Sequence, residues 1–189
     1  MKPIICIIGV SGSGKSTIVN RLERKYGYKS VRSYTTRPIR ENDDKDIYTH
    51  TFISSEEVEN YKDNIVAYNK YNGYEYFATQ QQIDEADLYV TDIVGLCELK
   101  EKYQGCKTIL SFFIDCDSSI VAKRMADRGD SDEQIMKRLD YDSKAFKDGK
   151  HICDFIFTNE NRNQMNDIVD YIALTLEHYN SRIYGTMEI

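Results

Sequence analysis

One stretch near the start of the chain constrains the fold more than any other part of the sequence. Residues 9–16 read GVSGSGKS and match the pattern G-x-x-x-x-G-K-[ST] of a phosphate-binding loop. An apolar run at residues 4–8 comes directly before the loop, and residues 16–26 after it carry apolar side chains at helical spacing. We therefore predict a buried strand, a phosphate loop and a helix in immediate succession.

The rest of the chain repeats this alternation of strand and helix. Apolar runs at residues 88–91, 108–114 and 155–158 predict strands, and helical patterns follow them at residues 96–103, 119–126 and 164–179. Strands that alternate with helices favour a mostly parallel, doubly wound sheet. A chain of 189 residues with 41% hydrophobic content fits one such α/β domain, which spans residues 1–189.

Two segments depart from the alternation. Residues 33–87 are polar and rich in tyrosine, and the sequence SSEE at residues 54–57 predicts the capped start of a short helix. Residues 124–147 are strongly charged and predict polar helices. We expect residues 33–87 to form an inserted lobe and residues 124–147 a helical lid, on a core of residues 1–32, 88–123 and 148–189.

Composition narrows the classes of function. A net charge of −6 argues against nucleic-acid partners, because binding to the phosphate backbone needs a basic surface. The apolar run at residues 4–10 is far shorter than a membrane span. Five cysteines, an odd number without Cys-x-x-Cys spacing, suit reduced thiols, so we expect a cytoplasmic protein. The sequence leaves the oligomeric state open.

The phosphate loop predicts a nucleotide site. Glycines allow backbone N–H groups to turn toward phosphate oxygens, Lys15 neutralises the β and γ phosphates of ATP, and the Ser16 hydroxyl can hold Mg²⁺. Asp92, at the end of the predicted strand 88–91, is the expected second magnesium ligand. The residues expected to bind the nucleotide are Ser11, Gly12, Ser13, Gly14, Lys15, Ser16 and Thr17. Asp92 also begins a D-x-x-G match typical of GTPases, but no N-K-x-D sequence follows it.

Arginines provide the second signal. Arg37 and Arg40 lie three apart in a predicted loop and suit bidentate binding of a second phosphate. Arg124, Arg128 and Arg138 lie in the predicted lid, where they can neutralise charge on a phosphoryl group in transfer. Ion pairing on the helix surface with Asp127, Asp130 or Asp132 is the alternative for these three.

The chain resembles the guanylate kinase family of nucleoside monophosphate kinases. The resemblance rests on the phosphate loop, on SVRSYTTRPIR and YNGYEYFAT, on Asp92, and on RMADRGDSDEQIMKRL and CDFIFTNEN, and it covers nearly the whole chain. It implies phosphoryl transfer from ATP to GMP, with Mg²⁺. Catalytic roles are implied for Lys15, Arg124, Arg128 and Arg138, an adenine contact for Asn159, and acceptor contacts for Ser33, Arg37, Arg40, Tyr48, Tyr76 and Thr79.

Departures from the family pattern lie on the acceptor side. Extra residues follow Asp46, so Tyr48 is our first choice for one phosphate-binding tyrosine and His50 our second. Two acidic positions that read guanine in the family fall on Ala67 and Val94. The alternatives are therefore another nucleotide, a deoxynucleotide or a phosphorylated ribose as acceptor. A non-catalytic guanylate-kinase-like interaction module is a further alternative, and the intact phosphate loop argues against it.

Overall fold

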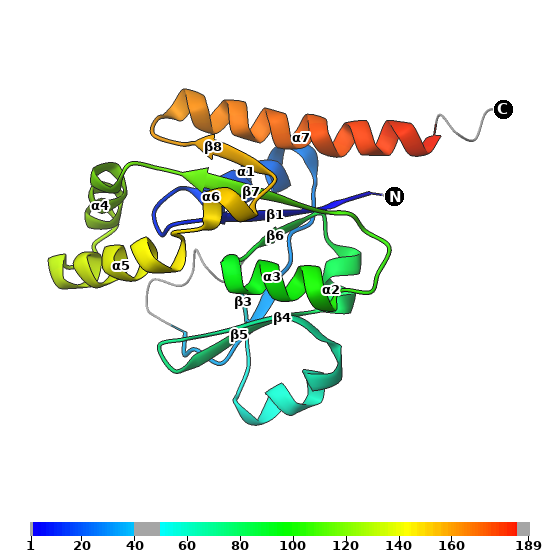
Figure 1. Ribbon diagram of the computed structural model, residues 1–189, viewed down its shortest axis with the longest axis horizontal. Coiled ribbons are helices and arrows are strands. Elements are labelled where there is room, and N and C mark those ends of the chain that lie inside the picture. The colour runs from blue at the N-terminus through cyan, green and yellow to red at the C-terminus, as the bar shows by residue number, and fades with distance from the viewer. Residues whose placement is uncertain (1, 40–49, 185–189) are drawn as a thin grey trace.

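The protein is described by a computed structural model that covers residues 2–39 and 50–184 (Figure 1). The first half of the chain forms β1 (Ile4–Gly9), α1 (Lys15–Tyr26), β2 (Ser33–Thr35), β3 (His50–Phe52), the 3-10 helix η2 (Glu56–Asn64), β4 (Ile65–Tyr71) and β5 (Tyr74–Thr79). The second half forms α2 (Gln80–Glu85), β6 (Leu88–Val90), α3 (Ile93–Lys102), β7 (Ile109–Asp115), α4 (Ser118–Asp127), α5 (Asp132–Ala145), α6 (Gly149–Ile152), β8 (Phe155–Thr158) and α7 (Arg162–Tyr184).

The core is a parallel sheet with the strand order β6-β1-β7-β8. These are the four strands that the apolar runs predict, and β1 lies between β6 and β7. The mixed α/β class with a mostly parallel sheet is therefore confirmed. Because parallel strands need crossover connections, each strand of this sheet is followed by at least one helix.

Side chains of β1 alternate between two apolar layers. Ile4, Cys6 and Ile8 pack with α3, whereas Ile5 and Ile7 pack with residues of α1 and α7. Figure 1 shows α1 and α7 on one side of the sheet and α3 on the other. A strand buried on both faces reads as an unbroken apolar run, which is why the sequence IICII predicts it so clearly.

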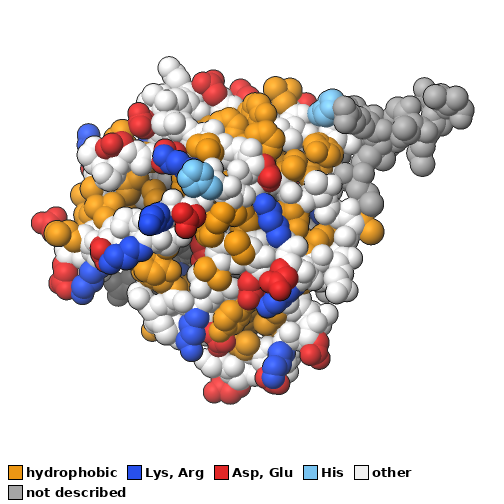
Figure 2. All heavy atoms as spheres, viewed as in Figure 1, with side chains coloured by type: hydrophobic (Ala, Val, Ile, Leu, Met, Phe, Trp, Pro, Cys, Tyr) orange, Lys and Arg blue, Asp and Glu red, His pale blue; other side chains and the backbone are white. Residues whose placement is uncertain are grey.

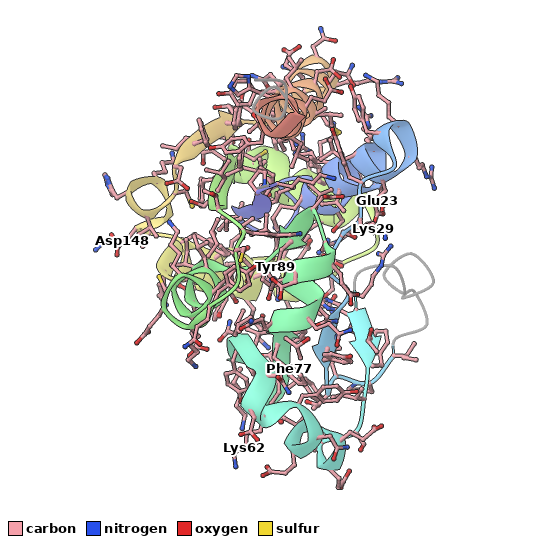
Figure 3. The ribbon with its side chains drawn as sticks, turned by 90° about the vertical axis from the view of Figure 1, so that its right-hand side faces the viewer. Glu23, Lys29, Lys62, Phe77, Tyr89 and Asp148 are labelled. Carbon is pink, nitrogen blue, oxygen red and sulfur yellow. The ribbon has the colours of Figure 1, made fainter. Side chains whose placement is uncertain are left out.

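The predicted lobe contains a second four-stranded sheet with the order β3-β2-β5-β4. Strands β4 and β5 form a hairpin whose two-residue turn is Asn72-Gly73, both with positive φ, at 51° and 82°. In Figure 3, Phe77 of β5 lies in this sheet, and Tyr89 of β6 lies in the core above it. The side of β4 that faces the core packs against α3.

The predicted lid, residues 124–147, contains the end of α4 and all of α5, and the two helices meet through an apolar cluster of Val121, Met125 and Ile135. A capping box of Ser131 and Gln134 begins α5. On the face drawn in Figure 2, basic and acidic side chains are interspersed over the surface. Among the helices of the described residues, none is both long and apolar enough to cross a membrane.

Candidate active site

The phosphate loop joins β1 to α1, and two of its glycines have no room for a side chain. Gly9 has a φ of 151°, and a Cβ there would collide with the carbonyl oxygen of Ile114 on β7. Gly14 has a φ of 99°, and a Cβ there would collide with the amide of Asn159. Only glycine combines this conformation with such close neighbours, so the motif is fixed by local geometry as well as by ligand chemistry.

Lys15 lies folded over the loop. Its Nζ donates to the carbonyl oxygens of Gly9 at 2.7 Å and Val10 at 2.8 Å. Burial lowers the pKa of Lys15 from 10.5 to about 8, and the carboxylate of Asp142 is the main charge that opposes this shift. The side chain is therefore a partly desolvated cation at the place where the sequence predicts the β and γ phosphates of ATP.

Two predicted site residues donate hydrogen bonds to the backbone of the loop. Asn159 is fully buried, and its Nδ2 donates to the carbonyl oxygen of Ser13 at 2.6 Å. Arg124 of α4 donates to the carbonyl oxygen of Gly12 at 3.2 Å and lies 3.3 Å from the Sγ of Cys116. Both contacts position the loop backbone, and the predicted adenine contact of Asn159 stays a prediction.

A cavity of about 640 Å³ opens from the phosphate loop toward the second sheet. It is lined by the loop, by the lobe and by the lid together. The predicted site residues that line it are Ser11, Lys15, Arg37, Tyr76, Asp92, Arg128 and Arg138. Residues from segments far apart in sequence thus line one cavity, which is large enough for a small ligand.

The lobe side of this cavity is a cluster of polar and aromatic side chains. Arg37 is nearly buried, donates to the carbonyl oxygen of Pro38 at 3.1 Å, and lies over the ring of Phe52 at 5.2 Å. The Oγ of Ser33 lies 2.8 Å from Nδ1 of His50, whose ring meets Tyr76 edge to face at 5.6 Å. These contacts hold a guanidinium at the wall of the cavity.

Three more acceptor contacts were predicted, and each of them stays a prediction. Arg40 and Tyr48 lie outside the described residues. Thr79 is the N-cap of α2, where its Oγ1 accepts from the N–H of Gln82. Because the Thr79 hydroxyl takes part in the cap, its acceptor contact stays a prediction. His50, our second choice beside Tyr48, does line the cavity.

Asp92 forms the floor of the cavity below the lobe. One carboxylate oxygen accepts the N–H of Gly95 at 2.8 Å and so caps α3, and the other accepts from the amide of Asn69 on β4. A smaller cavity of about 140 Å³ continues from this point, between β4 and the end of β6. Asp92 therefore links the core sheet to the second sheet.

The predicted magnesium ligands fit an ion held mostly by phosphate oxygens. Among the described residues, no group of three or more His, Cys, Asp or Glu side chains is placed to hold a metal. Mg²⁺ at nucleotide sites needs only one or two protein oxygens, with phosphates and waters completing its shell. Ser16 is exposed at the start of α1 and Asp92 lines the cavity, so each can offer one oxygen, and their joint role as magnesium ligands stays a prediction.

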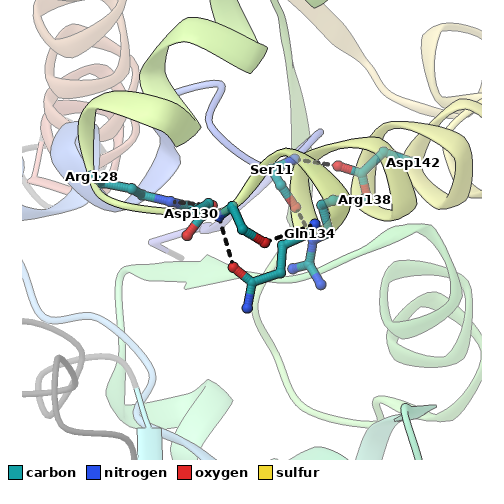
Figure 4. A network of polar contacts seen from close by, with 7 residues as sticks. Ser11, Arg128, Asp130, Gln134, Arg138 and Asp142 are labelled. Carbon is teal, nitrogen blue, oxygen red and sulfur yellow. Dashed lines mark hydrogen bonds and ion pairs between the residues drawn. The ribbon is translucent and has the colours of Figure 1, made fainter.

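The lid contacts the loop directly, as Figure 4 shows. The Nε of Arg138 donates to the Oγ of Ser11 at 2.5 Å, and its guanidinium lies 4.8 Å from the ring centre of Tyr71. Arg128 is paired with Asp130 at 2.5 Å, which is the surface ion pair that the sequence left as its alternative role. Arg138 is thus in contact with the loop, whereas Arg128 is held at the cavity rim.

Sequence reasoning missed two polar residues and an aromatic pair at this site. Asp142 accepts the N–H of Ser11, and Asn69 donates to Asp92. Tyr71 of β4 and Tyr141 of α5 meet edge to face at 4.7 Å, across the boundary between lobe and lid. A signal for Asp142 exists, because it lies four residues after Arg138 and hence on the same helix face. Asn69 carries no comparable signal.

The fold and the loop together define a mixed α/β P-loop protein with a guanylate-kinase-like fold. A family model described as an AAA domain (AAA_18) matches residues 5–144, so the chain belongs to this family. A crystal structure of guanylate kinase from Anaplasma phagocytophilum is similar in fold, with a TM-score of 0.63. The two sequences are 19% identical over 94% of this chain and 86% of the other. No curated protein matches the sequence.

Proposed function

We propose that the protein is an ATP-dependent nucleoside monophosphate kinase, with GMP as its acceptor. The observation that carries the proposal is that Lys15 of the phosphate loop and Arg37, two residues after β2, line the same cavity. A phosphate donor on the loop and a phosphate acceptor on Arg37 would meet inside it. Two cationic sites in one cavity suit transfer between two phosphorylated ligands.

The proposed reaction moves one phosphoryl group in line. An oxygen of the acceptor monophosphate attacks the γ phosphorus of ATP, a new P–O bond forms, and the bond to the β–γ bridging oxygen breaks to release ADP. The acceptor oxygen is already ionised at neutral pH, so the site needs no general base. The chain's task is to align two polyanions and neutralise their charge.

Each cation has a defined part in this scheme. Lys15 neutralises the donor phosphates, and Arg37 holds the acceptor phosphate. Arg138 contacts Ser11 of the loop and lines the cavity, where it would meet charge that develops during transfer. Bound Mg²⁺, held by Ser16 and Asp92, would supply further charge neutralisation on the donor phosphates.

The AAA-domain family and the likeness in fold to a guanylate kinase support a nucleotide kinase. The intact loop, with Lys15 folded over it, speaks against a non-catalytic interaction module. The acceptor base needs a separate test, because Ala67 and Val94 replace two acids of the guanylate kinase pattern. An acceptor panel therefore belongs in the first experiment.

The test is a coupled assay of ADP formation with ATP, Mg²⁺ and a panel of acceptors. The panel contains the common nucleoside and deoxynucleoside monophosphates and a phosphorylated ribose. We expect GMP to be turned over with the highest kcat/KM. Absence of ADP formation with every acceptor would contradict the proposal, and a better acceptor than GMP would correct its substrate.

Two variants separate the donor half from the acceptor half. Lys15→Ala should lower kcat by about 10³-fold or more, because the transferring phosphates lose their cation. Arg37→Lys keeps the charge but loses the bidentate fork, so it should raise the acceptor KM at least about tenfold and leave the ATP KM unchanged. Circular dichroism of both variants should match the parent, since neither residue belongs to the apolar core.

A further inference from the structure

A lid carboxylate occupies the phosphate loop. The Oδ2 of Asp142 accepts the backbone N–H of Ser11 at 2.6 Å, although the two residues are 131 positions apart in the chain. Asp142 is only 3% exposed, and it comes from α5 (Figure 4). It is the kind of group that a phosphate loop is built to bind, namely an oxyanion that accepts a backbone N–H.

The surroundings of this carboxylate are cationic. Arg138, one turn earlier on α5, donates to the side chain of the same Ser11. Both Asp142 and Lys15 line the cavity, and Asp142 is the strongest charge partner of Lys15. A buried carboxylate is stable only where cations or hydrogen-bond donors compensate for its lost hydration. Here that compensation comes from groups that also suit a phosphate.

The position of Ser11 identifies which phosphate would compete. Ser11 lies at the start of the loop, and the cavity runs from it toward Arg37 and the second sheet. If the proposed function holds, the phosphoryl group in transfer lies between the loop and the acceptor, which is the Ser11 side. The terminal phosphate of the nucleotide would therefore need the N–H that Asp142 occupies.

We propose that Asp142 is an internal anion that occupies the terminal-phosphate position and latches the lid onto the loop in the ligand-free protein. A nucleoside triphosphate must displace the carboxylate, because two anions cannot share one donor and one lysine at such short range. A diphosphate leaves the terminal position empty and competes less. Triphosphate binding therefore releases α5, and it does so at the cost of affinity.

Removal of the Asp142 charge should strengthen triphosphate binding selectively. The variants are Asp142→Asn, which keeps an acceptor for Ser11 but loses the charge, and Asp142→Ala, which loses both. The matched control is Asp140→Asn, since Asp140 lies on the same helix with its side chain 68% exposed and is paired with Lys144 at the surface. It undergoes the same change of charge away from the loop.

Isothermal titration calorimetry should be done with ADP and with a non-hydrolysable ATP analogue that has an imido β–γ bridge. We expect Asp142→Asn to tighten binding of the analogue at least tenfold, Asp142→Ala at least as much, and ADP binding to change less than threefold. Asp140→Asn should leave both affinities unchanged. An unaltered ratio of the two affinities in Asp142→Asn, or weaker binding of the analogue, would overturn the latch.

Hydrogen–deuterium exchange of the ligand-free proteins tests the latch without nucleotide. Amides of α5 should exchange faster in Asp142→Ala than in the parent and in Asp140→Asn, and equal exchange in all three proteins would overturn the proposal. The latch rests on the proposed function only for the identity of its competitor. Phosphoryl transfer without a change in the affinity ratio refutes the latch alone, whereas a confirmed latch without transfer to any acceptor refutes the kinase alone.

Discussion

Lys15 is subject to two opposed effects at one atom. Burial disfavours its charge, while the nearby carboxylate of Asp142 favours it, and the net result is a pKa of about 8. A pKa of about 8 means that the ammonium loses its proton slightly above neutral pH. A phosphate that replaces Asp142 would restore a strong anionic partner, so nucleotide binding and protonation of Lys15 are coupled.

This coupling predicts that ATP affinity falls as pH rises through about 8. The free protein loses the Lys15 proton in that range, and a neutral amine has no electrostatic attraction to phosphate. Above the pKa, the dissociation constant should rise by about tenfold per pH unit, as expected for uptake of one proton on binding. The charged groups that act on Lys15 in this range are Asp142, Arg138, Arg128 and Asp92.

The effect on folding has the opposite sign. The unfolded chain keeps the proton up to about 10.5 and the folded protein only up to about 8, so this group's contribution to stability rises with pH between those values. Titration calorimetry with ATP from about pH 7 to about pH 9.5 measures the binding arm. Lys15→Ala is the control and should give a flat profile. A flat profile in the parent would show that Lys15 does not titrate in this range.

At the scale of elements, the sequence predicted those helices and strands that the local pattern of apolar and capping residues determines. The core strands are buried on both faces and read as apolar runs, and SSEE predicted the start of η2, where the N–H of Ser54 donates to Glu57. The order of strands in the second sheet was not predictable, because β2 and β3 have three residues each and pair across a long connection. The sequence places Asp142 on the helix face of Arg138, but its contact with Ser11 was missed because only the assembled fold brings α5 to the loop.

Ala67 on β4 and Val94 on α3, the two departures from the guanylate kinase pattern, lie in different environments. Ala67 of β4 is 0% exposed within the apolar layer that includes Leu96 and Leu99 of α3. Val94, at the first turn of α3, is 53% exposed. A carboxylate at position 67 would therefore be buried among apolar side chains, whereas one at position 94 would be hydrated and close to a helix N-terminus.

We expect Ala67→Glu to lower the free energy of unfolding by about 3 kcal/mol or more, as for an uncompensated buried charge. Val94→Asp should change it by less than about 0.5 kcal/mol. Urea denaturation followed by circular dichroism compares the two variants directly. Equal, small effects would mean that the side chain at position 67 points into the cavity, and a role for it in base recognition would then be restored.

At the scale of the whole molecule, the two sheets are parts of one packed body. One apolar layer contains Ile4 of the core sheet, Val66 and Ala78 of the second sheet, and Leu99 of α3 between them. Figure 1 shows α3 lying between the core sheet and the strands β4 and β5. The cavity is thus formed by elements that share a core, which favours a defined distance between Lys15 and Arg37.

A shared core predicts that both sheets unfold together. Differential scanning calorimetry should give one transition whose calorimetric and van't Hoff enthalpies agree. Leu99→Ala removes a fully buried side chain from the shared layer, so it should cost about 2–5 kcal/mol and shift that single transition to lower temperature. The control is Leu174→Ala on α7, which removes an exposed leucine and should leave the transition nearly unchanged. If Leu99→Ala instead split the transition into two, the second sheet would be an independent unit, and the alignment of donor and acceptor would have to come from the bound ligands.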